Sequence, residues 1–118
     1  MVQLNELRVG NWIIDAGCGR IQMRAELFDL WRGEHAMPIP LTPEILEKAG
    51  FVHIEGIPND YFKGLYSIRK EKRNGKYNLY SFYIHWDLKF SKLSEMSSLH
   101  QLQNLYFALT GNELEIKL

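Results

Sequence analysis

Apolar positions near the end of the chain repeat with the period of a helix. Within residues 97–111 they recur at intervals of three or four and share one stripe at about 100° per residue. They are Leu99, Leu102, Leu105, Tyr106 and Leu109. Gly111 follows the last of them and is typical of a helix end. The pattern predicts a helix whose apolar stripe is buried.

The opposite face of this helix has an unusual polar composition. It carries an imidazole, two amides and a phenyl ring at i, i+3, i+4 and i+7, namely His100, Gln103, Asn104 and Phe107. A solvated helix face more often carries Lys and Glu, which favour helix and dissolve well. Two interpretations follow: the face is a protein interface anchored by Phe107, or its amides satisfy backbone groups inside the fold.

The best-specified local element is a short helix over residues 42–50. Thr42 is a suitable N-cap, and Pro43 suits the first helical position. Gly50 suits the left-handed residue that follows a helix end. We expect one side of this helix to be buried and Phe51 to fold back against it.

Alternating apolar residues and turn signals divide most of the remaining chain into strands. We expect strands at residues 12–15, 20–24, 35–39, 52–54, 61–69, 76–85 and 113–118, with residues 86–90 as a further strand or a bend. Turns at residues 16–19 and 74–75 close two hairpins. Residues 25–31 fit a short helix, and residues 91–96 read as a loop.

These elements predict an α+β fold. We expect a curved antiparallel sheet or small open barrel of about six or seven short strands with two capped helices, the C-terminal helix being packed on the sheet. A chain of 118 residues fits a single domain, residues 1–118. The 46% hydrophobic and 24% charged residues are those of an ordinary globular protein.

Cysteine content and hydropathy predict a cytoplasmic location. Cys18 is the only cysteine, which excludes an internal disulfide framework. The longest apolar runs are a few residues, too short to span a membrane, and the first eight residues lack the apolar segment of a signal peptide.

Charge is unevenly distributed although the formal net charge is zero. Residues 1–60 carry 5 basic and 9 acidic side chains, and residues 61–118 carry 9 and 5. The basic excess gathers in the hairpin at residues 69–76, in Arg69, Lys70, Lys72, Arg73 and Lys76. Its strands display Tyr61, Phe62, Tyr66, Tyr77, Tyr80, Phe82 and Tyr83. Basic loops beside aromatic faces bind single-stranded nucleic acid, whereas charged hairpin tips also serve solubility alone.

No residue pattern indicates catalysis. The four histidines are 18, 32 and 15 residues apart, so no pair has the close spacing of a zinc site. Cys18 lies in a Gly-Cys-Gly turn without a neighbouring histidine, and no glycine-rich phosphate loop is present. We therefore expect no enzyme activity, catalytic residue, cofactor, metal or small-molecule substrate.

Three segments resemble a family of small uncharacterised bacterial proteins, several of them carried by prophages or mobile elements. The segments are residues 7–12 (LRVGNW), residues 38–46 (PIPLTPEIL) with Gly50 and Phe51, and residues 100–111 (HQLQNLYFALTG). The resemblance implies a phage-like or mobile-element origin and a cytoplasmic single domain. It implies no site residue.

The sequence thus predicts a non-enzymatic accessory protein that acts through a protein–protein interface on the C-terminal helix. The partner is another protein or a second copy, and the expected contacts are His100, Gln103, Asn104 and Phe107. The alternative is single-stranded nucleic-acid binding through residues 69–76.

Overall fold

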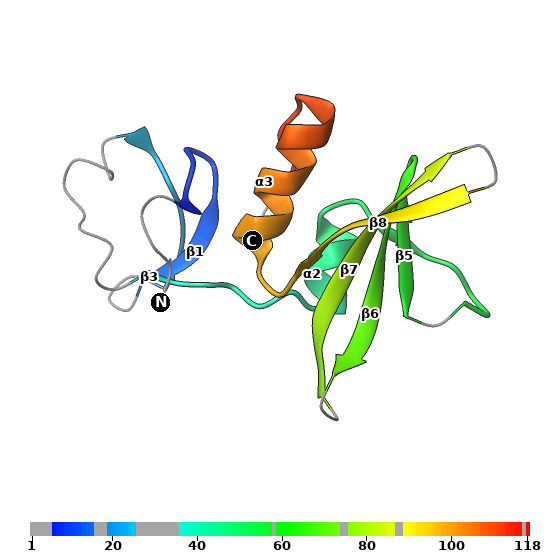
Figure 1. Ribbon diagram of the computed structural model, residues 1–118. Coiled ribbons are helices and arrows are strands. Elements are labelled where there is room, and N and C mark those ends of the chain that lie inside the picture. The colour runs from blue at the N-terminus through cyan, green and yellow to red at the C-terminus, as the bar shows by residue number, and fades with distance from the viewer. Residues whose placement is uncertain are drawn as a thin grey trace. The chain divides into compact units, whose positions relative to one another are not determined.

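The computed structural model describes residues 6–15, 19–25, 36–57, 59–73, 76–86, 89–116 and 118, with the backbone alone for residues 72, 73, 76–78 and 86. Its elements (Figure 1) are β1 (Trp12–Asp15), β2 (Gly19–Gln22), β3 (Ala36–Met37), α2 (Pro43–Lys48), β4 (Val52–His53), β5 (Asp60–Lys63), β6 (Tyr66–Arg73), β7 (Lys76–Trp86), β8 (Lys89–Met96) and α3 (Leu99–Thr110). The chain divides into two compact units.

The first unit combines the two ends of the chain, Met1–Pro40 with Ser98–Leu114 and Leu118. Its sheet is antiparallel with the order β2-β1-β3, and α3 contacts β1. The register of the first hairpin places Ile13 opposite Ile21. A small apolar core of this unit consists of Leu7, Ile13, Met23 and Ala36, with Ile21 packed against it.

A tight turn leads into β1. Asn11 N donates to Arg8 O at 3.1 Å, and Gly10 lies at φ +98°, a value that favours glycine at the third position of such a turn. Gly10 N donates to Met23 O at 2.8 Å, and Met23 N donates to Asn11 O at 2.7 Å. These bonds extend the pairing of the first hairpin and fix the course of the backbone before β1.

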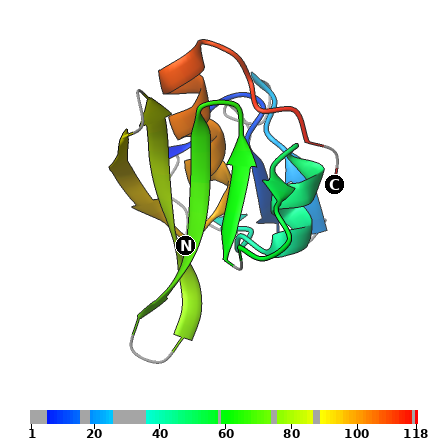
Figure 2. The same ribbon diagram turned by 90° about the vertical axis from the view of Figure 1, so that its right-hand side faces the viewer.

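The second unit, Leu41–Ser97 with Glu115–Lys117, contains a five-stranded antiparallel sheet in the order β4-β5-β6-β7-β8. Each strand pairs with its neighbour in sequence, and the β6–β7 hairpin extends beyond the other strands (Figure 2). Alternate residues bury one face of the sheet, including Tyr61, Ile68, Tyr80, Phe82 and Met96. Burial, then Glu47 and Glu44 of α2, raise the pKa of Tyr61, so α2 lies near this face.

The predicted caps of α2 are confirmed. The Thr42 side chain accepts a hydrogen bond from Ile45 N, and Pro43 is the first helical residue. At the other end Gly50 N donates to Glu47 O and Phe51 N donates to Leu46 O, with Gly50 at φ +93°. This pair of bonds is the Schellman ending, and it places the buried Phe51 against the helix.

Several predicted strands are wrong in detail. Residues 61–69 form two strands instead of one, because Gly64 at φ +59° turns the chain between β5 and β6. Residues 91–96 are the larger part of strand β8 and not a loop. β8 is an edge strand, and its residues 89–93 are exposed. Its exposed Ser and Lys side chains give no alternation of apolar and polar residues, so a hydrophobic pattern does not indicate a strand there. Residues 113–116 form no strand, although Leu114 and Ile116 are buried.

The α+β class with antiparallel sheets is confirmed. The described residues form eight strands in two sheets, neither of which closes on itself. The predicted hairpin at the first two strands is present, and α3 ends at Gly111 with φ +75° as expected. The short helix at residues 25–31 and the turns at residues 16–19 and 74–75 fall wholly or mostly outside the described residues. The single domain stays a prediction.

No helix in the described ranges is both long and apolar enough to cross a membrane.

Substituting Gly50 with alanine or valine should lower the free energy of unfolding by about 1 kcal/mol or more, because L-residues are strained at positive φ. A Cβ atom would also lie 2.6 Å from Lys63 Nζ, although that flexible side chain can move. Gly50→Asn is the matched control, since asparagine tolerates the left-handed region best. Chemical denaturation should rank the variants Gly, Asn, Ala and Val in falling stability; equal stability would contradict this ending of α2.

Candidate functional site

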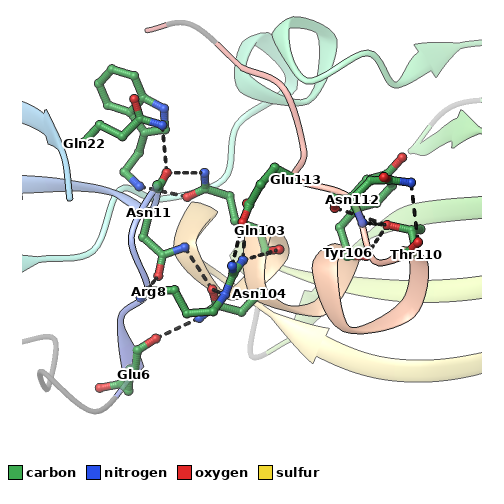
Figure 3. Close-up of polar contacts among 12 residues, drawn as sticks. Glu6, Arg8, Asn11, Gln22, Gln103, Asn104, Tyr106, Thr110, Asn112 and Glu113 are labelled. Atoms are coloured by element: carbon green, nitrogen blue, oxygen red, sulfur yellow. Dashed lines mark hydrogen bonds and ion pairs between the residues drawn. The ribbon is translucent and has the colours of Figure 1, made fainter. Parts of the chain in front are cut away.

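The polar face of α3 meets the chain's own N-terminal segment. Figure 3 shows the side chains of Gln103 and Asn104 joined by hydrogen bonds to residues between Glu6 and the start of β1. The turn before β1 presents backbone N–H and C=O groups to the helix, and a side-chain amide can satisfy both kinds. This contact decides what the unusual face of α3 does within the chain.

Gln103 is the most completely enclosed member of the face, with 1% of its surface exposed. Its Oε1 accepts a hydrogen bond of 2.8 Å from Trp12 N, and its Nε2 donates one of 2.9 Å to Gly10 O. Gly10 O also accepts a bond of 3.0 Å from Gln22 Nε2 at the surface. The two hydrogen bonds of the Gln103 amide thus fix where the start of β1 lies along α3.

Asn104, the next residue of α3, also bonds the segment before β1. Its Nδ2 donates to Glu6 O at 2.7 Å, and its Oδ1 accepts from Arg8 Nε at 2.8 Å and from Asn11 Nδ2 at 2.9 Å. Asn11 is fully buried, and its Oδ1 accepts from Arg8 N at 2.7 Å. Every amide atom in this pair of asparagines therefore has a partner in the chain itself.

Arg8 is held between a carboxylate and an aromatic ring. Its Nη1 donates to Glu113 Oε1 at 2.7 Å, and its Nη2 donates to Gln103 O at 3.2 Å. Its Cζ lies 4.4 Å from the centroid of the Phe107 ring, within the range of a cation–π contact. The planar guanidinium is thus fixed over Phe107, whose surface is still 39% exposed.

His100 lies in a buried position at the start of α3, with 2% of its surface exposed. Its Nδ1 is 3.2 Å from Ser98 Oγ, and its Nε2 is 3.5 Å from Glu6 Oε1. Burial lowers the pKa of His100 below its usual 6.5, and the Glu6 carboxylate acts in the opposite direction. The imidazole is therefore held in its neutral form near pH 7.

The four predicted interface residues thus separate into two groups. His100 and Gln103 are buried, and the amides of Gln103 and Asn104 bond residues of the same chain. Phe107 alone is exposed, and the prediction of a partner on this helix now depends on it. Leu99 and Leu102 are buried as predicted, whereas Leu109 is 38% exposed, so the apolar stripe is buried only over the first part of α3.

The predicted nucleic-acid residues do not share one side of the sheet. Arg69 and Lys70 are neighbours in β6 and therefore point to opposite faces. Arg69 donates to Asp60 through Nε at 2.9 Å, which raises the pKa of Arg69 further. The side chains of Lys72, Arg73 and Lys76 lie outside the described residues.

The second face of the five-stranded sheet, which we call the open face, carries a row of aromatic rings. The ring centroids of Phe62 and His85 are 6.0 Å apart, those of His85 and Phe90 5.6 Å, and those of Phe90 and Tyr83 5.6 Å. We call these four residues the aromatic row. It draws on β5, β7 and β8, three strands brought together by the sheet order.

Sequence analysis recovered only part of the aromatic row. Phe62 and Tyr83 were among the predicted strand aromatics, but Tyr61, Tyr80 and Phe82 belong to the buried face. His85 lies within the predicted strand at residues 76–85, but it was not among the aromatic residues singled out there. Phe90 lies in residues 86–90, which were predicted as a further strand or a bend, and it was not singled out either. Alternation within residues 79–85 was the available signal: it separates Tyr80 and Phe82 from Ser81, Tyr83 and His85.

The charges on the open face are joined in pairs. Arg69 bonds Asp60 and lies 5.5 Å from the ring centroid of Tyr83, and Lys92 forms an ion pair with Glu95. Tyr83 Oη donates to Glu71 Oε1 at 3.1 Å. Burial, followed by this bond, raises the pKa of Tyr83. The open face therefore presents both signs of charge around its rings.

Ser67 and His85 also meet on the open face, with Ser67 Oγ 2.6 Å from His85 Nε2. A serine next to a histidine is one component of nucleophilic catalysis. Ser67 is only 5% exposed, so its hydroxyl is closed to a substrate and the pair links β6 to β7. Among the described residues, no group of three or more His, Cys, Asp or Glu side chains is arranged to hold a metal ion.

Comparison of the chain with protein-family models, curated proteins and solved structures finds no match.

Replacing Gln103 with methionine should lower the free energy of unfolding by about 1–3 kcal/mol, because Trp12 N loses its acceptor in a buried place. Gln22→Met is the matched control: Gln22 donates to the same Gly10 O, but at the surface. We expect Gln22→Met to change stability by no more than about 0.5 kcal/mol. Urea denaturation compares the two, and equal small losses would refute a fixing role for Gln103.

Acidification should destabilise the protein through His100. The pKa of His100 is lower in the folded than in the unfolded chain, so the unfolded chain binds the proton first as the pH falls. This share of the stability is complete above about pH 6.5 and is lost as the pH falls toward the folded pKa. Denaturation at a series of pH values should give His100→Gln a flatter profile than the parent, and an unchanged profile would contradict a buried, neutral imidazole at this position.

Proposed function

We propose that this chain is a non-enzymatic accessory protein that binds another protein through a surface centred on Phe107. The Phe107 surface consists of the Phe107 ring, the Arg8 guanidinium on it and the Glu113 carboxylate that holds Arg8. Phe107 is the exposed residue of the helix face that the sequence analysis singled out, since His100 and Gln103 are buried. His100, Gln103 and Asn104 support this surface from beneath and do not contact the partner.

The observation that carries the proposal is an exposed aromatic ring under a fixed arginine. Three groups hold the guanidinium 4.4 Å from the ring: Glu113 Oε1 at 2.7 Å, Asn104 Oδ1 at 2.8 Å and Gln103 O at 3.2 Å. Aromatic residues and arginine dominate the binding energy of protein interfaces. A side chain already fixed in the free protein loses little entropy on binding, so this pair favours a protein partner.

The motif resemblance supports a role in a phage or mobile element, located in the cytoplasm. Residues 7–12 and residues 100–111 carry the first and third of the resembling segments. They are the two halves of the contact that builds the Phe107 surface. The two segments contain Arg8 and Phe107, the arginine and the ring of this surface.

Single-stranded nucleic-acid binding through residues 69–76 is the second proposal. It is supported by the net charge of +4 in this segment and by the position of Arg69 beside Tyr83. The paired carboxylates Asp60 and Glu71 on the same face oppose it, because they repel a phosphate backbone. The protein-binding proposal is therefore preferred.

Phe107→Ala should weaken binding to the protein partner while the fold persists. Tagged parent protein and variant are used to capture partners from a host lysate with and without nuclease treatment, and the captured protein is then purified and titrated by calorimetry. A lost anchor of about 2 kcal/mol weakens binding roughly 30-fold.

Phe90→Ala is the control, since Phe90 is an exposed phenylalanine of the other unit. Unchanged affinity for Phe107→Ala, or capture that nuclease removes, would contradict the Phe107 surface and favour nucleic acid.

A further inference from the structure

The open face of the five-stranded sheet has apolar side chains that its own unit leaves exposed. The strand register places Val52 opposite Phe62 and His85 opposite Phe90, so all four share this face. Val52 is 61% exposed and Phe90 57% exposed. Sheets commonly bury such a face against a second sheet at a distance of about 10 Å. The sheet therefore has one packed face and one that is suited to an additional layer.

The charges on the open face indicate what that layer is. The described residues of this face include three carboxylates (Asp60, Glu71, Glu95) and two cations (Arg69, Lys92), interspersed and bonded to groups of the same face. A polyanion gains little from cations that already have carboxylate partners. Two copies of a surface with mixed signs do not repel each other, and the zero formal net charge of the chain removes long-range repulsion.

We propose that two copies of this chain associate by packing the open faces of their five-stranded sheets against each other. In a two-fold dimer the same patch contributes from both sides, so one exposed ring makes its contact twice. The aromatic row, with Phe90 as its most exposed ring, forms the centre, and the paired charges of Arg69 and Lys92 form the rim. Homodimer interfaces have this apolar centre and polar rim.

The geometry of β8 favours packing through the face over pairing through the edge. β8 is the long edge strand of the sheet, and its register with β7 shifts between Phe82 and Tyr83. Such a bulge, together with Lys89 and Lys92 in the strand, obstructs the addition of a further strand. The other edge, β4, has two residues. A second copy is therefore expected on the face.

Sedimentation equilibrium of the full chain over a range of concentrations tests the dimer. We expect the parent to form dimers in the micromolar range and Phe90→Asp to weaken the association roughly 30-fold or more, since the carboxylate enters the centre twice. Val52→Asp is a second variant on the same face, which keeps the test decisive if Phe90→Asp folds poorly. Circular dichroism establishes that each variant is folded.

Phe107→Asp is the matched control, because it introduces the same charge at an exposed phenylalanine of the other unit. It should leave the dimer intact. A parent that stays monomeric at several hundred micromolar overturns the proposal, as does a dimer lost in Phe107→Asp but kept in Phe90→Asp. A fluorescent single-stranded oligonucleotide that binds the parent at low salt, and not Phe90→Asp, would assign the open face to nucleic acid instead.

Discussion

The structure depends on the hydrogen bonds that two amides of α3 make to the segment before β1. These bonds connect residues that are 91 to 98 positions apart and join the two ends of the chain into one unit. Closing so long a loop costs entropy, and burial of the small apolar core around Ile13 helps to offset that cost. Apolar contacts are not directional and do not define one register between α3 and the segment before β1. The hydrogen bonds that Gln103 makes with Trp12 N and Gly10 O define that register.

This constraint explains the composition of the helix face and the position of the candidate surface. A buried Lys or Glu would carry an unpaired charge against the backbone of residues 6–12, whereas an amide offers a donor and an acceptor together. Because the amides are used within the chain, the partner binding that we propose falls to the rim of this contact. There Arg8 is fixed by Glu113 and Asn104, and Phe107 remains exposed beneath it.

The five-stranded sheet separates its aromatic residues by the two-residue period of a strand. Tyr80 and Phe82 enter the core, while Tyr83 and His85 belong to the open face. The same alternation separates Arg69 from Lys70 and prevents these two basic residues from forming one surface. Ion pairs with Asp60 and Glu95 then leave the open face close to neutral. Aromatic rings surrounded by charges of both signs are more typical of a protein–protein interface than of a phosphate-binding surface, which needs an excess of positive charge.

The sequence by itself determined the locally encoded elements: the caps of α2, the end of α3 at Gly111 and the first hairpin. Their signals act within about four residues, through backbone angles and capping bonds. Tertiary structure alone decided that Gln103 and Asn104 bond residues 6–12, that residues 91–96 form an edge strand, and that Leu114 and Ile116 are buried without strand pairing. These outcomes depend on which distant groups complement one another in space, and the spacing of residues along a chain does not carry that information.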